Sequence, residues 1–189
     1  MVSGKVYGLQ GINGSGKTML MRMILGLIRP SSGEVLFNDK KLGKDLDFPD
    51  HVGFLLENPA FLERYTGYQN LQMISSVKTG IDCSKIWETL DRVGLSEAAA
   101  KKKYRKYSLG MKQRLGIAAA IMGEPDIIIL DEPTNALDTS GNEIVKHIIE
   151  EERTRGALVI VASHEQSLLE NICDEIFKLE NGRLIEHLK

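Results

Sequence analysis

The chain has 189 residues, which is enough for one domain, or for one domain with an attached lobe. Its composition is that of a folded globular protein, with 42% hydrophobic and 26% charged residues. The formal net charge of −2 excludes a strongly basic chain that would bind nucleic acid or an anionic membrane through its overall field.

Membrane spans and export signals are also absent from the sequence. No apolar run approaches the roughly 20 residues that a membrane helix needs, and the first residues lack the apolar segment of a signal peptide. Cys83 and Cys173 lie far apart, without the spacing of a metal or redox motif, and are interpreted as reduced structural thiols. These features indicate a cytosolic protein but do not indicate an activity.

Hydrophobic periodicity predicts strands that alternate with helices along most of the chain. Strands are expected over residues 5–10, 34–37, 52–56, 127–130 and 157–162, and helices over residues 17–27, 110–122, 141–153 and 165–171. Met19, Met21 and Met23 of the first helix are interpreted as core residues. Near the C-terminus, Asn181-Gly182 is a strong signal for a β-hairpin between residues 175–179 and 183–187. The alternation predicts an α/β fold with a mainly parallel sheet flanked by helices.

The pattern changes in the middle of the chain. From residue 59 to residue 106 it contains helical periods only, over residues 68–77, 84–93 and 96–103. We therefore expect residues 1–58 and 107–189 to form an α/β core, and residues 59–106 to form an inserted helical lobe.

A phosphate-binding loop is predicted between the first strand and the first helix. Residues 11–18, GINGSGKT, match the pattern G-x-x-x-x-G-K-[ST]. The glycines let backbone N–H groups converge on phosphate oxygens, and the helix N-terminus adds its dipole. Lys17 is expected to reach the β- and γ-phosphates of ATP, and the Thr18 hydroxyl to bind Mg²⁺. The loop residues expected to bind the nucleotide are Asn13, Gly14, Ser15, Gly16, Lys17 and Thr18.

Two acidic residues follow an apolar strand. Residues 127–130, IIIL, end in Asp131 and Glu132, at the carboxyl end of a strand where open parallel sheets bind ligands. We expect Asp131 to bind Mg²⁺, and Glu132 to act as the general base that polarises the attacking water.

The chain resembles the nucleotide-binding subunit of an ABC transporter over nearly its whole length. Residues 107–114, YSLGMKQR, resemble the signature LSGGQ of that family, with Ser108 and Gly110 matching and Leu109 and Met111 departing from it. Asn135-Ala136-Leu137-Asp138 resembles the D-loop, and His164, after a buried strand, resembles the switch histidine. The resemblance implies a P-loop NTPase fold and Mg²⁺-dependent ATP hydrolysis.

The resemblance also implies a partner. Ser108, Gly110 and Asp138 are expected to act at the nucleotide of a second copy, so that two subunits enclose two ATP molecules in an ATP-dependent homodimer. His164 is expected to contact the γ-phosphate and to position the water. A polytopic membrane permease is the other expected partner, which implies a cytoplasmic protein held peripherally on the inner face of the cell membrane. Nucleic acid is not expected to bind, and the basic run at residues 101–106 is interpreted as a solvated helix end.

Glu57 departs from the family, which usually has glutamine at this place. A carboxylate there adds negative charge beside the metal, so Glu57 is expected to contribute to Mg²⁺ binding and catalysis. The stretch LLENPAFLERYTGYQNL, together with YSLGMKQRLGIA, resembles the subgroup that exports or expels peptide antibiotics such as lantibiotics and bacitracin. This resemblance implies self-protection against such a peptide.

A second departure concerns the start of the chain, where family members usually carry about twenty more residues with an edge strand and an adenine-stacking aromatic. The sequence predicts that this edge region is missing, and Tyr7 is a poor substitute because it lies on the strand that enters the loop. Two alternatives therefore stay open: a degenerate or truncated nucleotide-binding module with a regulatory role, and a soluble ABC ATPase that acts outside transport.

Overall fold

The structure is a computed structural model that describes residues 1–57, 59–77 and 81–188. Its main sheet has six strands in the order β4-β5-β6-β1-β7-β8. All neighbouring strands are parallel except β7 and β8, which form an antiparallel hairpin. The strands are β1 (Val6–Gln10), β4 (Val52–Leu55), β5 (Ile127–Asp131), β6 (Leu158–Ser163), β7 (Glu175–Glu180) and β8 (Arg183–Leu188). The predicted α/β fold with a mainly parallel sheet is confirmed.

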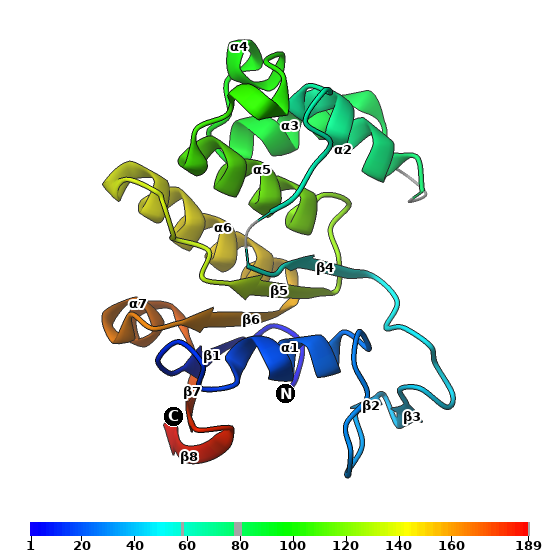
Figure 1. The fold of residues 1–189 in the computed structure, drawn as a ribbon, viewed down its shortest axis with the longest axis vertical. Helices are drawn as coiled ribbons and strands as arrows, with labels where there is room; N and C mark the ends of the chain where they lie inside the picture. Colours follow the sequence, from blue (N-terminus) through cyan, green and yellow to red (C-terminus); the bar gives the residue numbers. More distant parts are fainter. Residues whose placement is uncertain (58, 78–80, 189) are drawn as a thin grey trace.

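Helices cover both faces of this sheet (Figure 1). Successive strand residues point to opposite faces, so Ile128 and Leu130 of β5 join one apolar cluster while Ile129 joins the other. On the face of Ile129, helix α1 (Lys17–Ile24) packs through Met21. On the opposite face lie α5 (Leu109–Ile121), α6 (Thr139–Arg155) and α7 (Gln166–Ile172). The helices and strands alternate in sequence, which produces this three-layer arrangement.

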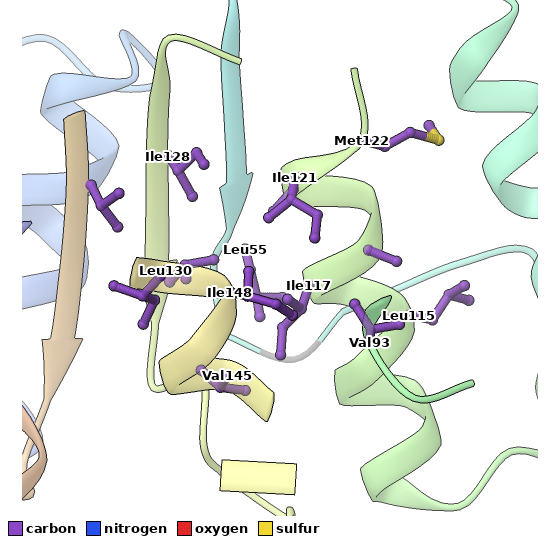
Figure 2. Close-up of a cluster of buried hydrophobic side chains, with 14 of the residues drawn as sticks. Leu55, Val93, Leu115, Ile117, Ile121, Met122, Ile128, Leu130, Val145 and Ile148 are labelled. Atoms are coloured by element: carbon purple, nitrogen blue, oxygen red, sulfur yellow. The ribbon is translucent and has the colours of Figure 1, made fainter. Parts of the chain in front are cut away.

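The larger apolar cluster joins the sheet to α5 and α6. Figure 2 shows Leu55 of β4 and Ile128 of β5 beside Ile117 and Ile121 of α5. Each of these four side chains is at most 3% exposed. Burial of an aliphatic side chain of this size contributes about 1.5–3 kcal/mol, so this contact fixes α5 on the sheet.

Between residues 59 and 106 the elements of the described chain are helices joined by turns, with one isolated β-bridge between Thr66 and Lys103. The helices are α2 (Gly67–Ser75), α3 (Cys83–Arg92), α4 (Glu97–Ala100) and a 3-10 turn, η1 (Tyr104–Lys106). These elements lie at the end of the molecule near α5 (Figure 1). The proposed division into a core and a lobe stays an expectation, and its boundary residue 58 lies outside the described residues.

Several local predictions differ from the structure. The strand expected over residues 34–37 is short: β2 (Leu36–Phe37) pairs with β3 (Lys40–Lys41) in a separate two-stranded sheet. Its turn, Asn38-Asp39, has φ angles of 47° and 65°, which suit a tight hairpin. Helix α1 ends before the expected residue 27, where Gly26 adopts φ 75°. Met19 is 51% exposed, so its interpretation as a core residue is wrong.

Candidate active site

The loop that joins β1 to α1 is exposed from Ile12 to Gly14. Gly14 and Gly16 adopt φ angles of 83° and 106°, a backbone region that residues other than glycine rarely occupy. Gly16 is the N-cap of α1, and no side chain caps that end of the helix. The first N–H groups of α1 therefore remain available for an anion, which the helix dipole also favours.

Lys17 places its ammonium group inside this loop. The side chain is only 5% exposed, and its Nζ donates to the carbonyl oxygens of Gly11 at 2.5 Å and Ile12 at 3.3 Å. A carboxylate oxygen of Glu132 lies 3.7 Å from the same nitrogen. The ammonium thus has one distant anionic neighbour and two neutral ones, an environment that favours a phosphate oxygen.

Thr18 and Asp131 meet at the end of β5. Thr18 Oγ1 donates to Asp131 Oδ2 at 2.6 Å, and Asp131 is 3% exposed. Burial raises the pKa of the Asp131 carboxyl above its ordinary value, and the hydrogen bond from Thr18 opposes that rise. A buried carboxylate beside a hydroxyl is a donor set that fits Mg²⁺, because hard cations prefer oxygen ligands.

Protein groups alone do not make a complete metal site here. Among the described residues there is no group of three or more histidine, cysteine or acidic side chains arranged around one point. In phosphate-transferring proteins one or two side chains commonly bind magnesium, and phosphates and water supply the other oxygens.

Glu132 follows Asp131 in a left-handed backbone conformation, with φ 48°. Its Oε2 lies 2.9 Å from His164 Nδ1 and accepts from Ser163 Oγ at 3.3 Å. Its Oε1 is buried and has no hydrogen bond within the described chain. A buried acceptor without a donor is costly, so this oxygen is suited to receive a proton or a water molecule.

Glu57 lies at the end of β4 and also has a left-handed backbone, with φ 51°. Its Oε1 accepts from Arg22 Nη2 at 2.8 Å, and the side chain is 59% exposed. An ion pair this exposed contributes little stability. The contact with Arg22 of α1 was not expected from the sequence, because the two residues lie 35 positions apart.

These groups line one cavity of about 350 Å³. Its lining contains the predicted residues Asn13 to Thr18, Glu57, Asp131 and Glu132, together with Met19, Gln113 and Asn135, which were not predicted as site residues. A larger cavity, of about 830 Å³, lies at the opposite ends of β5 and β6, beside Asp126 and Leu158. We assign the site to the smaller cavity because ligands bind outside the carboxyl ends of parallel strands.

Ser108, Gly110 and Asp138 do not line this cavity. Ser108 accepts from Met111 N at 3.2 Å and caps α5, and Asp138 caps α6 through Gly141 N at 2.9 Å. The hydrogen bond from Gly141 N is the main reason that the pKa of the Asp138 carboxyl is lower than its ordinary value. A Cβ atom on Gly110 would lie 2.9 Å from the Ala136 carbonyl oxygen, so the first turn of α5 touches the loop that precedes α6. The structure therefore places most of the predicted residues in the cavity lining and leaves Ser108, Gly110 and Asp138 outside it. His164 is also outside the lining and contacts it through Glu132.

Comparisons with known proteins agree on one family. A family model described as ABC transporter matches residues 1–135. The chain is 44% identical over 181 residues to the ABC transporter ATP-binding protein YybJ of Bacillus subtilis, covering 96% of this chain and 83% of that protein. Identity is 42% over 187 residues to the bacitracin transport ATP-binding protein BcrA of Enterococcus faecalis, with 98% of this chain covered. It is 36% over 183 residues to the lantibiotic transport ATP-binding protein SrtF of Streptococcus pyogenes, covering 96% of this chain and 78% of that protein.

Some of these relatives are considerably longer: the chain spans 60% of the length of BcrA. Among solved structures, a dimeric ATP-binding cassette in a post-hydrolysis state, bound to ADP and Pi, superposes with a TM-score of 0.88 at 25% identity. That alignment covers 98% of this chain and 85% of the solved one.

Proposed function

The chain belongs to the ABC transporter ATP-binding family, and from this membership we propose that it binds ATP and hydrolyses it to drive a separate membrane permease. The observation that carries the proposal is Glu132. Its carboxylate contacts His164 through Oε2, while the buried Oε1 has no hydrogen bond in the described chain and lies 3.7 Å from Lys17 Nζ, in the cavity that also holds Asp131. A carboxylate so arranged is suited to accept a proton from water.

In this proposal the phosphates of ATP lie against the loop of residues 11–16 and the N-terminus of α1. Lys17 binds the β- and γ-phosphates, with the backbone N–H groups of Asn13, Gly14 and Gly16 around them. The Ser15 N–H donates to the Ile12 carbonyl oxygen at 3.1 Å, so Ser15 takes part through the loop that this bond shapes. Thr18, Asp131 and Glu57 would hold Mg²⁺, which when bound neutralises charge on the β- and γ-phosphates. Glu57 binds Arg22 through Oε1, which leaves its Oε2 for the ion.

Hydrolysis follows from these positions. The oxygen of a water molecule forms a bond to the γ-phosphorus, while the bond from that phosphorus to the oxygen shared with ADP breaks and its electron pair leaves with ADP. Glu132 accepts the proton that the water loses. His164 Nδ1, at 2.9 Å, holds the Glu132 carboxylate, and its other ring nitrogen remains for the γ-phosphate.

Dimerisation accounts for the second group of residues. Ser108, Gly110 and Asp138 lie at the N-termini of α5 and α6 and outside the cavity. We propose that they complete the nucleotide site of a second copy of the chain, so that ATP holds the two copies together. The dimeric form of the solved ATP-binding cassette supports this arrangement.

The names of the relatives suggest a substrate class. Because one relative is described as a bacitracin transporter protein and another as a lantibiotic transporter protein, we propose export of, or immunity to, a peptide antibiotic. In the described part of the chain, no helix combines the length and the apolar character that crossing a membrane requires. We place the protein at the inner face of the cell membrane, bound to a permease.

The test of hydrolysis is a Glu132→Gln variant, which keeps the size of the side chain and removes the base. Turnover of ATP should fall by at least ~10²-fold, the scale of a lost general base, while ATP binding is retained. In the presence of ATP the variant should accumulate as a dimer on size exclusion. Glu165→Gln, an exposed neighbour of His164, is the matched control and should keep wild-type turnover. A Glu132→Gln protein with unchanged turnover would exclude this residue as the base.

A further inference from the structure

Gln113 lies behind the Glu132 backbone, inside the protein. Its side chain is 5% exposed and comes from α5, where it lies on the side of the helix that faces the end of β5. The Nε2 atom donates to the carbonyl oxygen of Glu132 at 3.0 Å and to that of Pro133 at 3.1 Å. The side chain therefore holds two successive peptide groups of the segment that carries the proposed base.

The hydrogen-bond partners of the Gln113 side chain determine the orientation of its amide group. The two carbonyl oxygens can only accept hydrogen bonds, so the atom facing both of them has to be the nitrogen. Both N–H groups of the amide are then used, one for each carbonyl. A carboxylate or an apolar side chain of the same size at position 113 would leave these buried carbonyl oxygens without that donor.

The segment needs to be held because its backbone is unusual. Glu132 has φ 48°, a conformation that costs free energy for a residue with a side chain. Its N–H donates to Ala162 O at 2.9 Å, and its carbonyl accepts from Asn135 N at 3.1 Å as well as from Gln113. Ala162 and Asn135 act through their backbones, so in the described chain Gln113 is the side chain that holds this peptide in place.

We propose that Gln113 is a positioning residue for Glu132: it fixes the left-handed backbone that directs the carboxylate into the cavity. It also links two parts of the site. Ser108 caps the N-terminus of the same helix, five residues before Gln113. A movement of α5 that follows contact between Ser108 and a second copy is therefore transmitted to the Glu132 peptide. The inference rests on the proposed function of Glu132.

The decisive variant is Gln113→Met, which keeps the size of the side chain and removes both donors. The kcat for ATP hydrolysis should fall at least ~10-fold, while KM and the affinity for ATP stay within about threefold, because Gln113 holds the base and not the phosphates. Gln113→Glu should lose more at neutral pH, since an acceptor oxygen then faces two carbonyl oxygens. Lowering the pH should restore part of that loss, because a protonated carboxyl donates one hydrogen bond. Gln72→Met, at an exposed position of α2, is the control and should keep wild-type kcat.

A double-mutant cycle separates positioning from general structural damage. If Gln113 acts through Glu132, adding Gln113→Met to Glu132→Gln should reduce kcat by less than twofold further. If the losses of kcat in the two single variants multiply in the double variant, the proposal is wrong. It is also wrong if Glu132→Gln is inactive while a folded Gln113→Met protein keeps kcat within twofold of wild type. An active Glu132→Gln protein would instead contradict the proposed function. If Gln113→Met fails to fold, Gln113→Glu and its pH profile supply the same decision.

Discussion

Gly53 of β4 provides a sharp test of how α5 is placed on the sheet. A Cβ atom at this position would lie 1.6 Å from the carbonyl oxygen of Ala120 and 2.9 Å from a side-chain carbon of Pro125. Ordinary van der Waals contact begins at 3.4 Å. Because the first obstacle is the backbone of a 13-residue helix, no side-chain rotation relieves it, and α5 has to move away from β4.

We expect Gly53→Ala to destabilise the protein by about 3 kcal/mol or more, the upper part of the range for overpacked cores. For a domain of this size, that loss lowers Tm by roughly 6–12 °C. Phe54→Ala is the control, because the Phe54 side chain is 48% exposed on the same strand. Thermal unfolding of both variants without nucleotide measures the effect. A Gly53→Ala protein whose Tm lies within 2 °C of wild type would refute the packing argument.

Two further predictions concern charge in the cavity. Lys17→Ala should weaken ATP binding by at least ~100-fold in calorimetry, since loss of one partner from a buried charged pair costs about 3–5 kcal/mol. Lys40→Ala, at an exposed position of β3, should bind as wild type does, and an affinity for Lys17→Ala within a few-fold of wild type would contradict the phosphate-loop assignment. Asp131→Asn should raise the Tm of the nucleotide-free protein at pH 7, because burial raises the pKa of Asp131 and the folded state therefore disfavours its ionised form. That gain should shrink as the pH falls through the raised pKa and Asp131 takes up its proton. A gain independent of pH would argue against burial as the cause.

Local sequence patterns predicted individual strands, helices and turns. The apolar run before Asp131 predicted β5, and Asn181-Gly182 predicted the hairpin of β7 and β8. They did not give the order of strands, since pairing depends on segments far apart in the chain. Asn38-Asp39 is a local turn signal, and it joins β2 to β3 in a hairpin where the sequence predicted a single strand over residues 34–37.

The sequence predicted those residues of the candidate site that belong to one continuous motif. The phosphate loop and the acid pair line one cavity, as residues at neighbouring carboxyl ends of strands should. Gln113 and Arg22 could not be predicted in the same way. Gln113 acts on a peptide 19 residues further along, and Arg22 of α1 meets Glu57 of the segment after β4, so their roles depend on packing between elements.

The position of β1 in the middle of the sheet has a consequence for how the chain folds during translation. Val6 pairs with Val159 and Tyr7 with Glu175, so the strand that leads into the phosphate loop precedes both of its neighbours by about 150 residues. At a ribosomal rate of roughly 5–20 residues per second, β1 waits on the order of ten seconds before either neighbour is translated. During that interval it is an apolar segment with free edges, the kind of segment that chaperones bind and that aggregates when they are scarce. A growing chain should therefore acquire the ability to bind ATP abruptly and late, once β6 and β7 have left the ribosome.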